Sequence, residues 1–128
     1  MAWIGVGVVV LGGATVFGTR SVRAKVAERD LTRLGQGVPT VVQVHDPQCP
    51  TCNALQSQTR QALKGFEQDK LQYLVADIKT QEGLSFAGRY GVPHVTLLLF
   101  DSEGNLVETL QGMRQASELR ASFEKLAR

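Results

Sequence analysis

Two cysteines separated by two residues, Cys49 and Cys52, restrict the fold of this 128-residue chain more than any other feature of its sequence. They follow an apolar, β-branched run over residues 40–45 (TVVQVH), which predicts a buried strand, and an Asp46-Pro47 pair, which predicts a turn. A polar helix is predicted to open at the cysteines and to continue to about residue 64. A strand, a tight turn and a helix are therefore expected around the two sulfur atoms.

The start of a helix is a place where a cysteine thiolate is stabilised. Unpaired backbone N–H groups and the positive end of the helix dipole both favour negative charge there. We expect Cys49 at the mouth of the helix and Cys52 one turn further in, close enough to join as a disulfide. Such a pair forms a two-electron thiol–disulfide couple.

Two other roles for the cysteines stay open on the sequence alone. Together with His45 and His94 they offer four ligands for zinc, although the spacing matches no familiar zinc finger. A pair that only fills space as small apolar side chains is the other alternative. The helix start favours redox chemistry over both, so the sequence predicts neither a metal ion nor a dissociable cofactor.

The composition excludes several classes of protein. Two cysteines are too few for a disulfide scaffold. The formal net charge of +2, without a run of Lys or Arg that alternates with aromatic residues, argues against nucleic-acid binding. With 43% hydrophobic residues, the chain can form one domain with a substantial core.

The first residues predict a transmembrane anchor over residues 1–19. Residues 2–18 contain no charge and are rich in Val and Gly, and Trp3 and Arg20 flank them as interfacial anchors. A cleaved signal peptide is the main alternative, but it normally carries a basic region before the apolar run; a buried soluble segment is another. The glycines of this segment would also allow a transmembrane partner subunit to pack closely.

Residues 20–37 are predicted to form a juxtamembrane helix and a linker. The helical part, residues 21–34, has one apolar face and a basic face that would meet membrane lipid headgroups. Positive charge follows the apolar run and none precedes it. The positive-inside rule therefore favours a single-pass inner (plasma) membrane protein whose domain faces the cytoplasm rather than the periplasm.

The rest of the chain alternates between strand and helix patterns. Parallel βαβ units that finish in an antiparallel hairpin need helices on both faces of the sheet. Cys49 would then lie at the carboxyl edge of the strands, where open α/β sheets carry their sites. The further predicted elements are a strand over residues 71–78, a helix over 81–90, a strand over 94–100, a hairpin turn over 101–105, a strand over 106–110 and a helix over 114–127.

The order of these elements, together with several short motifs, resembles the thioredoxin superfamily. The resemblance covers about residues 39–128 and is carried by the apolar run before the cysteines, by Cys-Pro-Thr-Cys itself, by the YGVP segment before the LLLF strand, and by a Glu-Gly-Asn turn. It implies an α/β, thioredoxin-like fold for residues 38–128: a central mixed sheet flanked by helices, preceded here by the N-terminal transmembrane helix.

Three positions depart from the pattern of that family. Gln48 stands where the family has Trp before the first cysteine, and Gln43 stands where thioredoxins keep a buried acid for proton transfer at the second. The family's cis-proline is assigned to Pro93, although alignment on the following strand would place Val95 opposite the cysteines.

The resemblance also implies a substrate groove beside the cysteines. Val92, just before the assigned cis-proline, would offer backbone groups to a bound peptide. His45 and His94 would either tune the thiolate and relay protons or simply face solvent.

The sequence therefore predicts a thiol–disulfide oxidoreductase that uses Cys49 and Cys52 to reduce or exchange protein disulfides at a membrane. Its partners would be protein thiol or disulfide substrates, membrane lipid and a transmembrane partner subunit. The alternative is a non-catalytic, thioredoxin-like accessory subunit that docks in a larger membrane protein complex.

Overall fold

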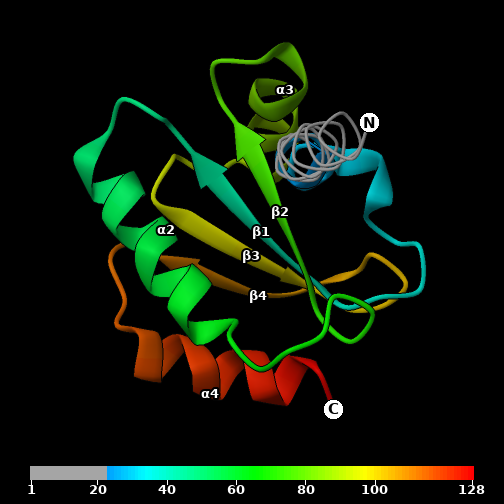
Figure 1. Cartoon of the computed structure of the whole chain (residues 1–128). Helices are drawn as coiled ribbons and strands as arrows, with labels where there is room; N and C mark the ends of the chain where they lie inside the picture. Colours follow the sequence, from blue (N-terminus) through cyan, green and yellow to red (C-terminus); the bar gives the residue numbers. More distant parts are fainter. Residues whose placement is uncertain (1–22) are drawn as a thin grey trace, which may run out of the picture.

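A computed structural model describes residues 23–128 and shows a four-stranded sheet with helices on both faces (Figure 1). The strand order is β2-β1-β3-β4, with β2 parallel to β1, β3 antiparallel to β1, and β4 antiparallel to β3. The predicted mixed sheet flanked by helices is therefore confirmed. The elements are η1 (Leu31–Arg33, a 3-10 helix), β1 (Thr40–His45), α2 (Pro50–Ala62), β2 (Gln72–Asp77), α3 (Gln81–Tyr90), β3 (Thr96–Phe100), β4 (Leu106–Gln111) and α4 (Ala116–Leu126).

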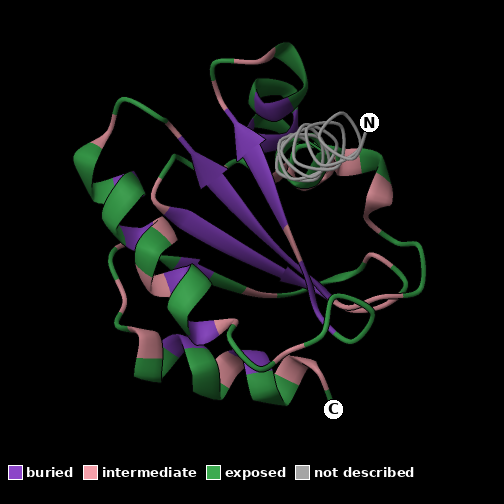
Figure 2. Cartoon of the chain, in the orientation of Figure 1, coloured by how far each residue is buried: buried purple, intermediate pink, exposed green. Residues whose placement is uncertain are grey.

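The central strands β1 and β3 are buried along their whole length (Figure 2). On one face of the sheet, Val41 belongs to an apolar cluster with Leu55 of α2 and Phe123 of α4. On the other face, Val42 packs in a second cluster with Phe86 of α3. Successive side chains of a strand point to opposite faces, so β1 contributes to both apolar layers. Coverage by helices on both sides explains why the sequence of β1 is nearly continuous in apolar residues.

The helices begin where capping groups are available. Cys49 caps α2, because its Sγ accepts a hydrogen bond from the Cys52 backbone N–H, and a proline occupies the first helical position. The Thr80 hydroxyl accepts a hydrogen bond from the Gly83 N–H at the start of α3, and α3 ends at Gly91 in a left-handed conformation. The cap of α2 places the cysteine pair just beyond the carboxyl end of β1.

The predicted helix over residues 21–34 is wrong in its second half. Residues 23–28 are helical, but the chain then turns, and the separate 3-10 helix η1 follows. The Asp30 side chain accepts a hydrogen bond from the backbone two residues further on and so caps η1. This break in the helix lets the leucines that follow pack against the layer that contains α3.

The predicted anchor over residues 1–19 lies outside the described residues. Within residues 23–128, no helix is both long enough and apolar enough to span a bilayer. The anchor and the domain boundaries drawn from it therefore stay predictions.

Candidate active site

The two cysteines lie at the amino end of α2, at the edge of the sheet where β1 ends. Cys49 is half-buried and Cys52 is fully buried, and both carry free thiols. The Cys52 backbone N–H donates a hydrogen bond to Cys49 Sγ at 3.3 Å. The Cys49 N–H donates to the carbonyl oxygen of Asp46 at 3.0 Å, which closes the turn. The first sulfur is thus held near the surface and the second in the interior.

The surroundings of the two sulfurs separate their acidities. A hydrogen bond from the Cys52 thiol lowers the pKa of Cys49, and the backbone N–H groups of Cys52 and Thr51 add to this, while the negative charge of Asp46 opposes it. Burial raises the pKa of Cys52, and its hydrogen bond to Cys49 raises it further. The thiolate is therefore favoured at Cys49, which is also the more accessible sulfur.

Gln43, buried in β1, lies behind the second cysteine. Its side-chain amide donates to the Cys52 carbonyl oxygen at 3.0 Å and lies 3.2 Å from His45 Nδ1. Its side-chain oxygen accepts a hydrogen bond from the Tyr73 hydroxyl at 2.6 Å, and Gln56 of α2 donates to the same hydroxyl at 3.4 Å. Gln43 therefore connects β1, β2 and α2. Because an amide takes up no proton, this position offers no base for the buried thiol.

His45 is buried at the end of β1 and is held in its neutral form. Because the Gln43 amide donates to Nδ1, that nitrogen is an acceptor and the ring proton lies on Nε2. Burial lowers the pKa of His45. The charged groups that act on the ring are Asp77 and Asp46, which raise its pKa, and Arg29 and Arg60, which lower it.

We expect acidification to destabilise the protein through His45. In the unfolded chain its pKa is the ordinary 6.5, whereas the folded protein takes up the proton only at lower pH. The free energy of unfolding should therefore be constant above about pH 6.5 and fall below it, with a slope of at most about 1.4 kcal/mol per pH unit. Urea denaturation at a series of pH values measures this slope. It should largely disappear in His45→Gln, and an unchanged slope would assign the titration to another group.

The assignment of a cis-proline to Pro93 is wrong. Every peptide bond within the described residues is trans, and Pro93 is exposed. The backbone of Val95 acts on the second cysteine, because a hydrogen bond to it lowers the pKa of Cys52 and so opposes the effect of burial. Its φ of 62° is left-handed, which costs a β-branched residue about 1–3 kcal/mol. Hydrogen bonds from its N–H to the Val44 carbonyl (3.2 Å) and from the Gly112 N–H to its carbonyl (2.9 Å) hold this conformation.

The loop before β3 brings His94, but not Val92, to the cysteines. The Sγ atoms of Cys49 and Cys52 and a ring nitrogen of His94 all lie within 4.8 Å of one another. His45 is outside this group. Val92 packs into the apolar layer around α3, and its N–H donates to the Ala87 carbonyl at 3.2 Å. That N–H is therefore occupied within the protein.

Tyr73 of β2 is a residue of the site that sequence reasoning missed. Its hydroxyl donates to Gln43, and burial raises its pKa, so it stays protonated and keeps this role. The guanidinium of Arg60 lies over its ring, 5.4 Å from the centroid. A tyrosine within an apolar strand is equally typical of core packing, so the sequence held no signal specific enough to identify it.

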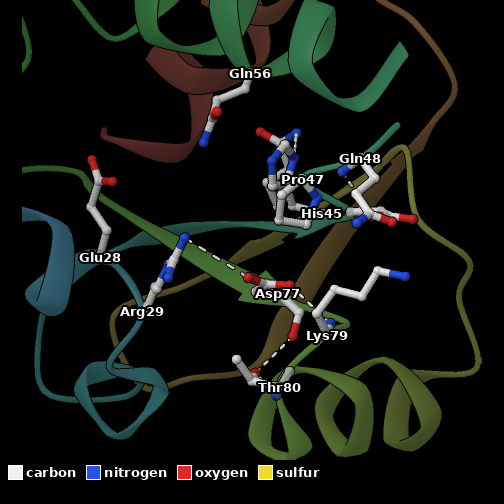
Figure 3. Close-up of polar contacts among 12 residues, drawn as sticks. Glu28, Arg29, His45, Pro47, Gln48, Gln56, Asp77, Lys79 and Thr80 are labelled. Carbon is white, nitrogen blue, oxygen red and sulfur yellow. Dashed lines mark hydrogen bonds and ion pairs between the residues drawn. The ribbon is translucent and has the colours of Figure 1, made fainter. Parts of the chain in front are cut away.

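Near His45, polar groups of the N-terminal segment and of the loop after β2 contact the end of β2 (Figure 3). Asp77, at the end of β2, lies 3.8 Å from Arg29 and accepts a hydrogen bond from the Lys79 N–H at 2.8 Å. A hollow of about 260 Å³ lies beside these groups and is bordered by His45 and Pro47. The N-terminal segment thus contacts the same edge of the sheet that carries the cysteines.

No profile of a known protein family matches the chain. Among solved structures, the thioredoxin of Malassezia sympodialis (Mala s 13) has a TM-score of 0.64 at 18% identity, covering 76% of this chain and 84% of that one. A thioredoxin-like protein from Clostridium perfringens has a TM-score of 0.63 at 22% identity, covering 77% and 78%. Trxlp from Edwardsiella tarda has a TM-score of 0.60 at 22% identity, covering 70% and 84%. The chain therefore has the thioredoxin-like fold.

Proposed function

We propose that the protein is a thiol–disulfide oxidoreductase that reduces or exchanges protein disulfides through Cys49 and Cys52. The Cys49 thiolate attacks one sulfur of the substrate disulfide, forms a mixed disulfide and releases the other substrate sulfur as a thiolate. Cys52 then attacks the Cys49 sulfur, forms the Cys49–Cys52 disulfide and releases the second substrate thiol. Two electrons and two protons pass from the protein dithiol to the substrate, so the exchange requires no cofactor.

The observation that carries this proposal is the asymmetry of the cysteine pair. Cys49 is accessible, caps a helix and has a lowered pKa, which are the properties of an attacking sulfur. Cys52 is fully buried and has a raised pKa, which suits a thiol that reacts only after a mixed disulfide has formed next to it. The two sulfurs therefore differ in accessibility and in pKa as the two-step reaction requires, with the more accessible and more acidic one attacking first.

Proton transfer at Cys52 cannot use a buried acid, as it does in thioredoxins, because Gln43 occupies that position. The side chain behind it is Gln43, which accepts no proton, and the neutral His45 already uses Nδ1 as an acceptor. The proton of Cys52 is therefore assigned to water or to the departing substrate thiolate. We expect the second step to be slower than in a protein with a carboxylate at this position.

Insulin reduction tests the proposed function. The full chain, purified in mild detergent and supplied with dithiothreitol, should accelerate precipitation of the insulin B chain, whereas the Cys49→Ser/Cys52→Ser variant should match buffer alone. Circular dichroism shows whether the variant is folded. Equal rates for the two proteins would contradict the proposal.

An accessory role is the second candidate function, and three observations favour it. Gln48 and Gln43 replace residues that serve exchange in the resembled family, and the backbone of Val95, rather than a cis-proline, interacts with Cys52. A subunit of this kind would hold a large partner independently of its sulfur chemistry. Copurification of a stoichiometric partner with the double serine variant, together with no insulin reduction by the wild type, would favour this role.

We further propose that residues 1–19 anchor the domain in the inner membrane, facing the cytoplasm. The uncharged apolar run and the basic residues that follow it support this arrangement. In that compartment the cysteine pair would be kept reduced and would act as a reductant. Labelling of the thiols in intact cells by a membrane-impermeant reagent would argue against this orientation.

A further inference from the structure

Three side chains that commonly bind metals meet at the edge of the sheet. The Sγ atoms of Cys49 and Cys52 and a ring nitrogen of His94 lie within 4.8 Å of one another. In a tetrahedral zinc site, with Zn–S about 2.3 Å and Zn–N about 2.1 Å, ligand atoms are separated by about 3.4–3.8 Å. The three atoms would therefore surround an ion after movements of about 1 Å, which side-chain rotation can supply.

The backbone around His94 provides a second observation. Between α3 and β3 the chain turns sharply, and Val95 adopts a left-handed conformation that is rare for a β-branched residue. Both backbone groups of Val95 are hydrogen-bonded, to Val44 and to Gly112. Strained residues that their surroundings hold in place cluster at functional sites. Here the strained residue fixes the loop that carries His94 next to the two sulfurs.

The donor set favours one kind of ion. Two thiolates and one imidazole suit Zn²⁺, and three protein ligands with a fourth position open to water are typical of its accessible sites. Cys49 is half-buried and His94 is exposed, so solvent reaches this side of the group. His45, the other histidine of the chain, lies outside this group, and its Nδ1 accepts a hydrogen bond from Gln43.

We propose that the reduced protein binds one Zn²⁺ ion through Cys49, Cys52 and His94. The site shares its two sulfurs with the exchange reaction proposed above, so each sulfur pair either holds the ion or forms the disulfide. When a protein disulfide oxidises the zinc form, two electrons pass to the substrate, which takes up two protons and leaves as two thiols, and Zn²⁺ is released. The ion would thus protect the reduced pair until a substrate removes its electrons.

Zinc titration of the full chain tests the site. The protein, in mild detergent, is reduced with a phosphine, freed of metal with a chelator and titrated with Zn²⁺ against a chromophoric competitor. We expect one ion per reduced chain and none per chain whose cysteines are oxidised to the disulfide. Co²⁺ should give thiolate-to-metal charge-transfer absorption and the intense visible bands of a tetrahedral site.

The two histidines provide a matched pair of variants. His94→Gln should lower the Zn²⁺ affinity by about tenfold or more and weaken the tetrahedral Co²⁺ bands, whereas His45→Gln should leave both unchanged. His94 is exposed, so its replacement should not affect folding, which thermal denaturation checks. Absence of binding to the reduced protein, or equal affinity in His94→Gln and the wild type, would overturn the proposal. Insulin reduction in chelator-containing buffer reports on the exchange function separately, so the two can fail independently.

Discussion

Cys52→Ser protein mixed with a disulfide substrate is expected to accumulate a covalent complex with that substrate. Cys49 keeps its position at the amino end of α2 in this variant, together with the backbone N–H groups that stabilise its thiolate. It can therefore still attack the substrate, but no second sulfur is present to resolve the mixed disulfide. Non-reducing electrophoresis should show the complex as a band that dithiothreitol removes.

Cys49→Ser is the matched control, since it also retains a single cysteine. The remaining Cys52 is fully buried, so a substrate cannot reach it. Burial also raises its pKa, so little of it is present as the thiolate that attacks. This variant should form almost no covalent complex, and insulin reduction should fall to the rate of buffer alone. Comparable complex formation by the two single variants would show that the sulfurs are interchangeable and would contradict the assigned roles.

Gly83→Ala is expected to destabilise the protein strongly, although it adds only one methyl group. A Cβ at this position in α3 would overlap the backbone of Asp77, including its carbonyl oxygen, at the end of β2. The atoms that the Cβ would meet belong to the backbone and not to a flexible side chain that could move away. The helix α3 would therefore have to shift away from the sheet. We expect the free energy of unfolding, measured by urea denaturation, to fall by about 3 kcal/mol or more.

Gly88→Ala in the same helix isolates the effect of that contact. A Cβ there meets nothing within 4 Å, and alanine restricts the unfolded chain and favours the helix. This variant should be as stable as the wild type or more stable by up to about 1 kcal/mol. If the two substitutions changed stability equally, the close approach of α3 to β2 would not be the cause.

The sheet could be predicted from the sequence because its pattern is strong and local. Strands buried on both faces appear as apolar, β-branched runs, and β1 and β3 lie where those runs are. The N-terminal helix was less predictable, because its apolar periodicity continues past residue 28, whereas the chain turns there and Asp30 caps the separate helix η1. Hydrogen bonding of one side chain to the nearby backbone competed successfully with the helical pattern.

Only the part of the candidate site whose residues are close together in the sequence could be predicted. The cysteines are identified by their own spacing and by the strand before them. The partners of Gln43 are not, because Tyr73 is 30 residues away in the chain and is brought near by the pairing of β1 with β2. The error at Pro93 has a similar origin: distance along the chain pointed to Pro93, whereas the start of β3 placed Val95 beside the cysteines.

A continuous line of contacts joins the N-terminal helix to the backbone of the second cysteine. Glu28 holds both terminal nitrogens of Arg60, at 2.7 and 3.0 Å; Arg60 covers the ring of Tyr73; and Tyr73 reaches Cys52 through Gln43. The outermost link is an exposed ion pair, which dissolved salt weakens, whereas the Tyr73–Gln43 hydrogen bond is partly buried and the Gln43–Cys52 hydrogen bond is buried. A higher ionic strength would thus loosen the connection between the N-terminal helix and the hydrogen bonds behind Cys52, without either cysteine changing its oxidation state.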